Sequence, residues 1–167
     1  MNLPPYDIFP NISADRISLR QVMLSDMNNI VEISFYDSIP AKTVDEATAI
    51  LEKINNDYLD GNSIHWGIVE TATNKLVGTC GFYRGLNKSE GELGCVLLPP
   101  FRGQGFMTKA MELAIDFGLN EIGLKRIWAI TTKENFKAIK LLERLQFIKI
   151  ADLEDDEIEF ELTTRKQ

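Results

Sequence analysis

The sequence predicts an α/β fold in which helices cover both faces of one mixed β-sheet. Short alternating or β-branched segments, which are typical of strands, are interleaved with longer segments of helical periodicity. Several predicted strands in the middle of the chain follow one another directly, which favours an antiparallel meander. The later strands alternate with helices, which favours strand–helix–strand crossovers and a parallel pair in the same sheet.

Length and composition set limits on the class of protein. The chain has 167 residues, 44% of them hydrophobic, which fits a single domain over residues 1–167 with a sizeable core. The formal net charge of −7 argues against a nucleic-acid-binding protein, which normally carries a basic face. No apolar run approaches the ~20 residues of a membrane span, and the N-terminus lacks a secretory layout, so we expect a cytoplasmic protein with no membrane partner. Cys80 and Cys95 lack metal-type spacing and are expected to be reduced, mostly buried thiols.

The first third of the chain is expected to form one strand and two helices. The alternating segment at 15–20 predicts the strand. Ser25 is the expected N-cap of a helix that runs through the stretch SDMNNIVEISFYDSI. Thr43 and Glu46 have the spacing of a capping box for the second helix, which Gly61 ends.

Three strands are expected next, in the segments SIHWGIVE, KLVGTCGFYR and GELGCVLLPP. The segment TATNK suits a hairpin turn between the first two, and Pro99 and Pro100 end the third. The stretch LLPPFRGQGFMTKAMELAIDFGL (97–119) then leads through a glycine turn directly into an amphipathic helix.

The C-terminal part is expected to hold a strand, a helix and a hairpin. The β-branched and aromatic segment KRIWAITTK predicts a buried strand. The segment ENFKAIKLLERLQF predicts a helix, and FIKI and EIEFEL predict a hairpin across ADLEDD. The apolar stripe of that helix is expected to consist of Phe136, Ile139, Leu142 and Leu145. The predicted order is therefore β-α-α-β-β-β-α-β-α-β-β, with seven strands.

The glycine turn RGQG (102–105) has the chemistry of an anion site. A helix N-terminus offers unpaired N–H groups and a partial positive charge, and glycine permits a close approach to the backbone. Glycines at such a turn can also be there only because the turn needs their backbone conformation. The residues by themselves therefore leave open whether this is an anion site or an ordinary turn. The sequence has neither a P-loop motif nor a dinucleotide fingerprint, so a phosphate ligand here points towards coenzyme A or a similar molecule.

The run ELGCVLLPPFRGQGFMTKAMELAIDFGL resembles the signature of the GNAT superfamily of N-acetyltransferases, particularly its ribosomal-protein N-acetyltransferase-like (RimJ/RimL-type) branch. The superfamily motif R/Q-x-x-G-x-G/A corresponds to Arg102, Gly105 and Met107, with Met107 in place of a small residue. The segments RISLRQVMLSDMNNI, WGIVETATNKLVGTCGF and ENFKAIKLLERLQF resemble the branch's opening strand and helix, central hairpin and last helix. The resemblance covers nearly the whole chain.

The resemblance implies that acetyl-CoA, as co-substrate, lies between two splayed strands, here GELGCVLL and RIWAITT. Backbone groups of Val96 and Leu97 would pair with the pantetheine arm, and Asn135 would hydrogen-bond it. Alternatively, Asn135 caps the helix that follows it. The residues implied to hold the pyrophosphate through their amides, with an added hydroxyl from the last, are Arg102, Gly103, Gln104, Gly105, Phe106, Met107 and Thr108. No metal is implied.

Acetyl transfer by direct attack in a ternary complex needs an unprotonated amine. A lysine-type amine has a pKa of ~10.4 and an α-amino group ~7.7–8.0, so a general base matters more for the first acceptor. By resemblance Glu92 is the candidate base, acting directly or through water; alternatively it is a solvated carboxylate at a strand end. Glu90 ranks lower. A strand amide near Val96 would hold the carbonyl oxygen. The implied acceptor is a protein N-terminal α-amine or a small amine.

The positions that usually protonate the leaving thiolate in this superfamily hold Ala138 and Leu142, which have no proton to give. Water or another residue, such as Tyr83, would then take that role. The departure keeps open an alternative function, a non-catalytic acyl-CoA-binding or regulatory module. His65 is expected to be partly buried or on the surface rather than catalytic, and Cys95 has no visible partner to activate it. Homodimers are common in such branches, but the residues themselves do not predict one.

Overall fold

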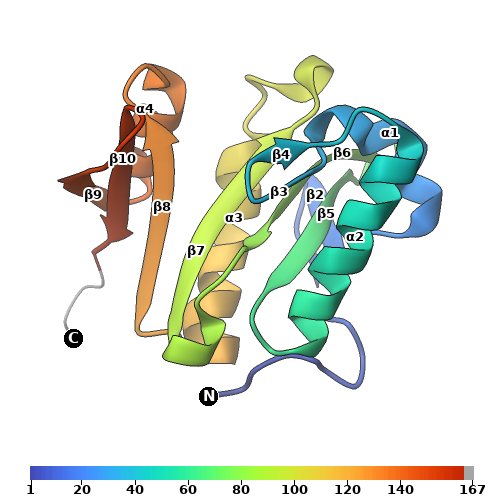
Figure 1. Ribbon diagram of the computed structural model, residues 1–167, viewed down its shortest axis with the longest axis horizontal. Coiled ribbons are helices and arrows are strands. Elements are labelled where there is room, and N and C mark those ends of the chain that lie inside the picture. Colours follow the sequence, from blue (N-terminus) through green and yellow to red (C-terminus); the bar gives the residue numbers. More distant parts are fainter. Residues whose placement is uncertain (164–167) are drawn as a thin grey trace.

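An eight-stranded mixed sheet forms the centre of the molecule in the computed structural model, which describes residues 1–163 (Figure 1). In spatial order its strands are β1 (Ile12–Ser13), β2 (Ile17–Arg20), β5 (Ile64–Glu70), β6 (Lys75–Phe82), β7 (Glu90–Leu97), β8 (Arg126–Thr132), β10 (Glu157–Leu162) and β9 (Phe147–Asp152). The strands β3 (Phe35–Tyr36) and β4 (Ile39–Pro40) form a separate ribbon. The α-helices are α1 (Met27–Ile30), α2 (Val44–Leu59), α3 (Phe106–Asp116) and α4 (Phe136–Arg144). None of the helices in this part of the chain is both long and apolar enough to cross a membrane.

The strands β7 and β8 form the one parallel pair of this sheet, and they pair over a short distance. Glu90, Gly91 and Glu92 lie opposite residues 126–128, and the register between the two strands ends there. Beyond this point β7 continues beside β6 and β8 continues beside β10, so β7 and β8 diverge (Figure 1). The sheet therefore consists of two parts joined at one end of β7.

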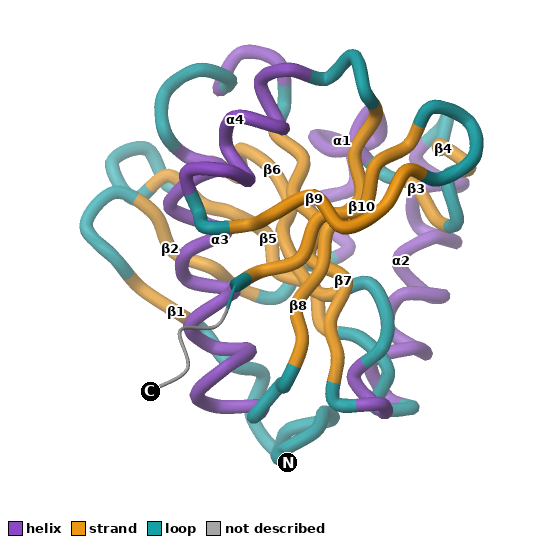
Figure 2. Tube along the Cα trace, turned by 90° about the vertical axis from the view of Figure 1, so that its left-hand side faces the viewer, coloured by secondary structure: helices purple, strands orange, loops and turns teal. Residues whose placement is uncertain are grey.

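Helices pack on both faces of the sheet, as predicted, and each face has its own core. Figure 2 shows α3 and α4 on one side of the strands and α2 on the other. The larger core lies under α3 and α4, and its buried members include Trp66, Phe82, Phe106, Ala110, Met111, Leu141 and Leu142. The smaller core lies under α1 and α2, and its buried members include Met27, Ile30, Ala47 and Leu51.

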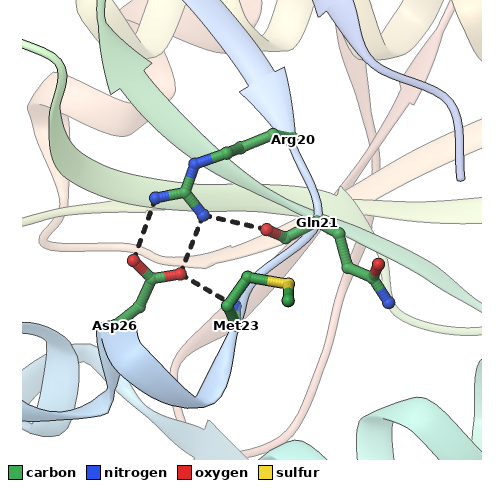
Figure 3. Close-up of polar contacts among 4 residues, drawn as sticks. All are labelled: Arg20, Gln21, Met23 and Asp26. Atoms are coloured by element: carbon green, nitrogen blue, oxygen red, sulfur yellow. Dashed lines mark hydrogen bonds and ion pairs between the residues drawn. The ribbon is translucent and has the colours of Figure 1, made fainter.

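The start of α1 is fixed by an ion pair with β2 (Figure 3). Both terminal nitrogens of Arg20 contact the carboxylate of Asp26, at 2.8 and 2.9 Å. The Met23 N–H donates to the same carboxylate at 2.8 Å. Burial alone would raise the pKa of Asp26, but Arg20 and the Met23 N–H hold that pKa below its ordinary value. The prediction of Ser25 as the N-cap was wrong, because Asp26 supplies the side chain that caps this turn.

The predicted helix from Ser25 was also wrong in its length. Helical turns end at Ile33, and the ribbon β3–β4 occupies the rest of the predicted segment. The turn between the two ribbon strands is made by Asp37 and Ser38, whose φ angles are 47° and 66°. Aromatic residues favour extended backbone and Asp and Ser favour turns, so local preference outweighs the helical spacing here.

The second helix follows the capping pattern read from the sequence. The Thr43 hydroxyl accepts from the Glu46 N–H at 3.1 Å, and the Glu46 carboxylate accepts from the Lys42 N–H at 2.6 Å. The helix ends before Gly61, which has φ +79° and so suits a left-handed helix end. The three central strands, the glycine-turn helix and the C-terminal hairpin were likewise predicted correctly.

Three further predictions about the sheet and its helices need correction. The sheet has eight strands rather than seven, because residues 12–13 add the short edge strand β1. The strand β8 is not buried throughout: Ile127 and Ala129 face the core, but Ile130 on the other face is 37% exposed. Phe136 belongs to the predicted apolar stripe but is 68% exposed, because α4 buries only its C-terminal half. Periodicity predicts the apolar face, not how far the surface beneath it extends.

Candidate active site

The divergence of β7 and β8 leaves backbone groups of β7 without a strand partner. The Tyr83 N–H donates to the Glu92 carbonyl and the Leu98 N–H donates to the Val77 carbonyl, each at 2.8 Å. Antiparallel strands bond through alternate residues, so the even-numbered residues of β7 turn their backbone groups towards β6. The backbone groups of Leu93, Cys95 and Leu97 therefore point away from β6, into the opening beside β8.

This alternation separates the two strand residues predicted to contact pantetheine. Leu97 presents its backbone to the opening, and its carbonyl accepts a hydrogen bond from Arg102 Nε at 3.4 Å. Val96 lies opposite Thr79, so its backbone groups face β6. Cys95, which the sequence interpretation left out of the cofactor site, presents its backbone as Leu97 does. The contact predicted for Val96 stays a prediction.

The glycine turn at the mouth of α3 carries a row of free amides. Gly103 and Gly105 have φ angles of +75° and +84°, and α3 begins at Phe106. Among the hydrogen bonds of residues 1–163, the backbone amides of 103–108 are not used as donors. A Cβ atom added at Gly103 would meet nothing within 4 Å, so this side of the turn is open. Unpaired amides at a helix N-terminus next to open space suit a pyrophosphate.

A cation that the sequence interpretation missed lies beside this turn. Arg16, in the connection before β2, donates from Nη1 to the Gln104 carbonyl at 3.0 Å. Its guanidinium also lies over the Phe106 ring, 5.0 Å from the centroid. Arg16 and Gln104 are far apart in sequence, and no local pattern links a residue before the first long strand to this turn.

Asn135 lies at the N-terminus of α4, as the capping alternative predicted. Its side-chain oxygen accepts from the Ala138 N–H at 3.2 Å. The cap uses the oxygen and leaves the amide nitrogen as a donor. The predicted contact of Asn135 with the cofactor arm is compatible with this arrangement and stays a prediction.

A cavity of about 710 Å³ lies on the face of the sheet that carries α2 and the β3–β4 ribbon. Its walls come from α1, α2 and the ribbon, and its floor from β5, β6, β7 and β8. The acidic residues that line it are Asp37, Asp57, Glu90 and Glu92. The aromatic residues that line it include Phe35, Tyr36, Tyr83 and Trp128. Arg84 and Lys88 also line it, so its acidic residues outnumber its basic ones, and a cavity of this size and charge suits a small cationic molecule.

Glu92 lies at the junction of this cavity and the opening between β7 and β8. It is the last residue of β7 that pairs with β8, and its side chain is 14% exposed. Arg84 Nε lies 2.7 Å from the Glu92 carboxylate, a contact that the sequence alone did not reveal. Burial raises the pKa of Glu92, Arg84 opposes that rise, and the nearby Glu157 adds to it. A partly buried carboxylate with a raised pKa is suited to accept a proton.

Tyr83 and His65 form a stacked pair in the floor of the cavity. Their ring centroids are 4.9 Å apart and the rings are nearly parallel, at 13°. The Tyr83 ring lies over Gly94 of β7, where an added Cβ atom would come within 2.1 Å of it. Burial raises the pKa of Tyr83 well above its ordinary value and lowers that of His65 to about 4. Near neutral pH Tyr83 therefore keeps its proton and His65 is uncharged.

The remaining sequence candidates do not supply acid or nucleophile chemistry. Leu142 is buried in the larger core, and Ala138 has no ionisable group. Cys95 lies opposite Cys80 in the register of β6 and β7, and both are free thiols, as expected. Contact with Cys80, together with burial, raises the pKa of Cys95, so the thiol stays protonated. Within residues 1–163, no group of three His, Cys, Asp or Glu side chains could hold a metal ion.

Comparison with known proteins places this geometry among acetyltransferases. The family described as the acetyltransferase (GNAT) domain matches residues 13–148. An uncharacterized N-acetyltransferase, p20, of Bacillus licheniformis is 32% identical over 86% of this chain and 85% of its own. The spermidine N(1)-acetyltransferase of Vibrio cholerae is 25% identical over 77% of this chain and 73% of its own. A solved structure from Vibrio cholerae, titled as a putative ribosomal-protein-serine acetyltransferase, has 18% identity and a TM-score of 0.78 over 92% of this chain and 97% of its own.

Proposed function

The chain belongs to the GNAT acetyltransferase family, and on this premise we propose that it moves the acetyl group of acetyl-CoA to a primary amine held in the acidic cavity. The observation that supports this most is the position of Glu92, where the cavity meets the opening between β7 and β8. An acetyl group in the opening and an amine in the cavity would both lie within reach of the Glu92 carboxylate. Acetyl-CoA supplies an activated acetyl group as a thioester when it is bound.

The residues around the opening fit this co-substrate. The free amides of 103–108 and the open side of Gly103 would hold the pyrophosphate. The backbone groups of Cys95 and Leu97 would pair with the pantetheine arm, as a neighbouring strand would. The Nδ2 group of Asn135 would add a donor from the N-terminus of α4.

In this proposal Glu92 takes the proton of the acceptor amine, directly or through a water molecule. Arg84 holds its carboxylate at 2.7 Å and keeps it from rotating freely. Tyr83, next to Glu92 in the cavity floor, is the proton donor for the leaving thiolate. The phenol carries its proton across the ordinary pH range, although burial, by raising the pKa of Tyr83, makes it a weaker acid than an exposed tyrosine. This role replaces the side chains that are missing at Ala138 and Leu142.

We propose a small amine as the acceptor. The cavity volume of about 710 Å³ lies within the usual range of small-molecule sites. The acidic lining residues attract a protonated amine before it loses its proton at Glu92. The relative from Vibrio cholerae that is named for spermidine is consistent with this choice. Membership of the ribosomal-protein branch stays a prediction, because the ribosomal-protein-serine neighbour shares only the fold.

The test is the release of free thiol from acetyl-CoA with a panel of small amines and N-terminal peptides. We expect turnover with small amines and a loss of about 10²- to 10⁴-fold in kcat for Glu92→Gln, at unchanged affinity for acetyl-CoA. Glu70→Gln is the control, because Glu70 lies on β5 outside the lining of the cavity, and we expect it to retain most of the turnover. Absence of thiol release with every acceptor contradicts the proposal. Turnover with peptides alone contradicts the choice of a small amine.

A further inference from the structure

Arg16 is a surface arginine beside the glycine turn, and the proposed chemistry does not use it. Its Nη1 atom donates to the Gln104 carbonyl at 3.0 Å. Its guanidinium also lies 5.0 Å from the ring centroid of Phe106, the first residue of α3. Phe106 is buried, so its ring is a fixed support for the guanidinium. Two contacts therefore hold the Arg16 side chain against the N-terminal end of the helix.

The carbonyl groups of the glycine turn differ in where their hydrogen bonds come from. The Pro100 carbonyl accepts from the side-chain amide of Gln104 at 3.1 Å, a contact within the turn. The Gly105 carbonyl accepts from the Lys109 N–H at 3.2 Å, a contact with the first turn of α3. The Gln104 carbonyl, by contrast, accepts from Arg16, which comes from a distant part of the chain. Arg16 therefore ties the middle of the turn to the start of β2.

The bond from Arg16 sets the direction of one amide in the turn. The C=O of Gln104 and the N–H of Gly105 belong to the same trans peptide unit, so they point in opposite directions. Rotation of this unit would put the carbonyl oxygen where the N–H now points. Gly105 has a φ of +84°, and a glycine accepts φ of either sign, so its own backbone does not prevent the rotation. The hydrogen bond from Arg16 opposes it.

The charges around Arg16 favour a role in orientation over a general attraction for anions. A small hollow beside the turn is lined by Arg16 and Lys109 and also by Asp15 and Glu112. The two positive and two negative side chains balance in number, so the net field of this group is weak at a distance. The effect of Arg16 on a ligand is therefore exerted mainly through the peptide that it contacts.

On the basis of the proposed use of acetyl-CoA, we propose that Arg16 is a positioning residue that keeps the Gly105 N–H directed at the pyrophosphate. Donation to the Gln104 carbonyl also polarises the same peptide unit and strengthens its N–H as a donor. Loss of Arg16 lets the peptide rotate and presents a carbonyl oxygen to an anion. Binding of acetyl donors that carry a pyrophosphate is then weakened, and the reaction of a donor without one is not.

The experiment compares three acetyl donors with one small amine as acceptor. Acetyl-CoA and acetyl-dephospho-CoA both carry the pyrophosphate, and only the first carries the 3′-phosphate; S-acetylpantetheine carries neither. For Arg16→Met we expect KM to rise about tenfold for both pyrophosphate donors, at unchanged kcat, because the lost interaction is remote from the reacting atoms. For S-acetylpantetheine we expect kcat/KM to equal that of the unmodified enzyme. Arg16→Lys keeps a donor and should recover part of the loss.

Lys125→Met is the matched control, because Lys125 is an exposed cation before β8, at the other end of the sheet from the turn. It should leave all three donors unchanged. Calorimetric titration with coenzyme A, dephospho-coenzyme A and pantetheine repeats the comparison without turnover, and thermal melting shows whether each variant is folded.

An equal loss with all three donors in Arg16→Met overturns the inference, because it shows an effect unrelated to the pyrophosphate. A loss with acetyl-CoA alone also overturns it, because Arg16 would then act on the 3′-phosphate. An unchanged KM for acetyl-CoA overturns it as well. Absence of thiol release from every donor in the unmodified enzyme instead overturns the proposed function.

Discussion

At Glu92, burial and a guanidinium group act on the carboxylate in opposite directions. Burial disfavours the ionised form, and Arg84 favours it through a contact of 2.7 Å. The result is a pKa that is raised, but less than burial alone would raise it. A carboxylate with a raised pKa is a stronger base than a free carboxylate and so takes a proton from an ammonium group more readily. Arg84 is therefore a positioning residue whose effect is visible in a pH profile.

Arg84→Gln should move the acidic limb of the kcat profile to higher pH. The substitution removes the charge that lowers the pKa of Glu92, so the carboxylate ionises only at higher pH. The measurement is kcat against pH with saturating acetyl-CoA and amine. Lys133→Gln removes an equal charge beside Asp152 and should leave the limb in place. An unmoved limb in Arg84→Gln would show that Glu92 does not control the profile.

Asp26→Asn should destabilise the protein at neutral pH by about 2 kcal/mol, because it leaves the partly buried Arg20 without its partner. The pKa of Asp26 is lower in the folded state than in the unfolded state. Its contribution is therefore complete above the unfolded value of ~3.9 and is lost as pH falls through the folded value. Urea unfolding at neutral and acidic pH measures the difference between the two proteins, which should shrink on acidification. Asp7→Asn, at an exposed position, should show no difference at either pH.

At the level of elements, the glycine turn and α3 act as one unit. The turn places two residues at positive φ directly before the helix, so its amides all lie at the positive end of α3. Arg16 holds the turn from outside through the Gln104 carbonyl. Any change that moves the turn moves the amide row with it.

Gly105→Ala should weaken acetyl-CoA binding by about tenfold. Alanine at a φ of +84° is strained by ~1–2 kcal/mol, and the strain is relieved by moving the turn and its amides. Gly123 has a φ of +85° and lies after the helix, away from the turn, so Gly123→Ala carries the same strain without touching the amides. Calorimetric titration with acetyl-CoA separates the two variants. An equal loss of affinity in both contradicts the role of the amide row.

The elements that could be predicted from the sequence are those whose local signals agree. The Thr43 capping box and the three central strands are of this kind. The segment around Phe35 has helical spacing but extended and turn preferences, and in the structure, where β3 packs against α2, the extended and turn preferences prevail. At the site, Glu92 could be singled out from the sequence because it belongs to a contiguous motif, and its role stays a prediction. The stack of His65 on Tyr83 could not, because it depends on the register of two strands.

On the scale of the whole molecule, two parts of one sheet meet at a short junction. The part with β8, β9, β10 and α4 is joined to the rest of the sheet through the three residue pairs of β7 and β8. A ligand that pairs with the open backbone of β7 and also contacts α4 would connect both parts. Binding should therefore stabilise the molecule as a whole and the C-terminal part in particular.

Acetyl-CoA at 100 times its dissociation constant should add about 2.7 kcal/mol of stability. For a chain of this length the corresponding rise in Tm is about 5–10 °C. Hydrogen exchange should show new protection at the amides of Cys95 and Leu97 and in β8 and β10. The amide of Leu98, which already donates to Val77, should not change. Protection confined to the glycine turn would contradict a ligand that spans both parts of the sheet.

The glycines Gly81 and Gly94 face each other across β6 and β7, beside His65 and Tyr83 in the floor of the cavity. A Cβ atom at Gly81 would lie 2.2 Å from the Ile64 carbonyl oxygen, and one at Gly94 would lie 2.1 Å from the Tyr83 ring. Neither position can accept a larger residue without movement of backbone or ring, whereas the walls from α2 and the ribbon are free of that restriction. Among descendants of a common ancestor, the floor should stay unchanged and new acceptors should be acquired through the walls. Aligned sequences of such proteins would show glycine at both floor positions and diversity along α2.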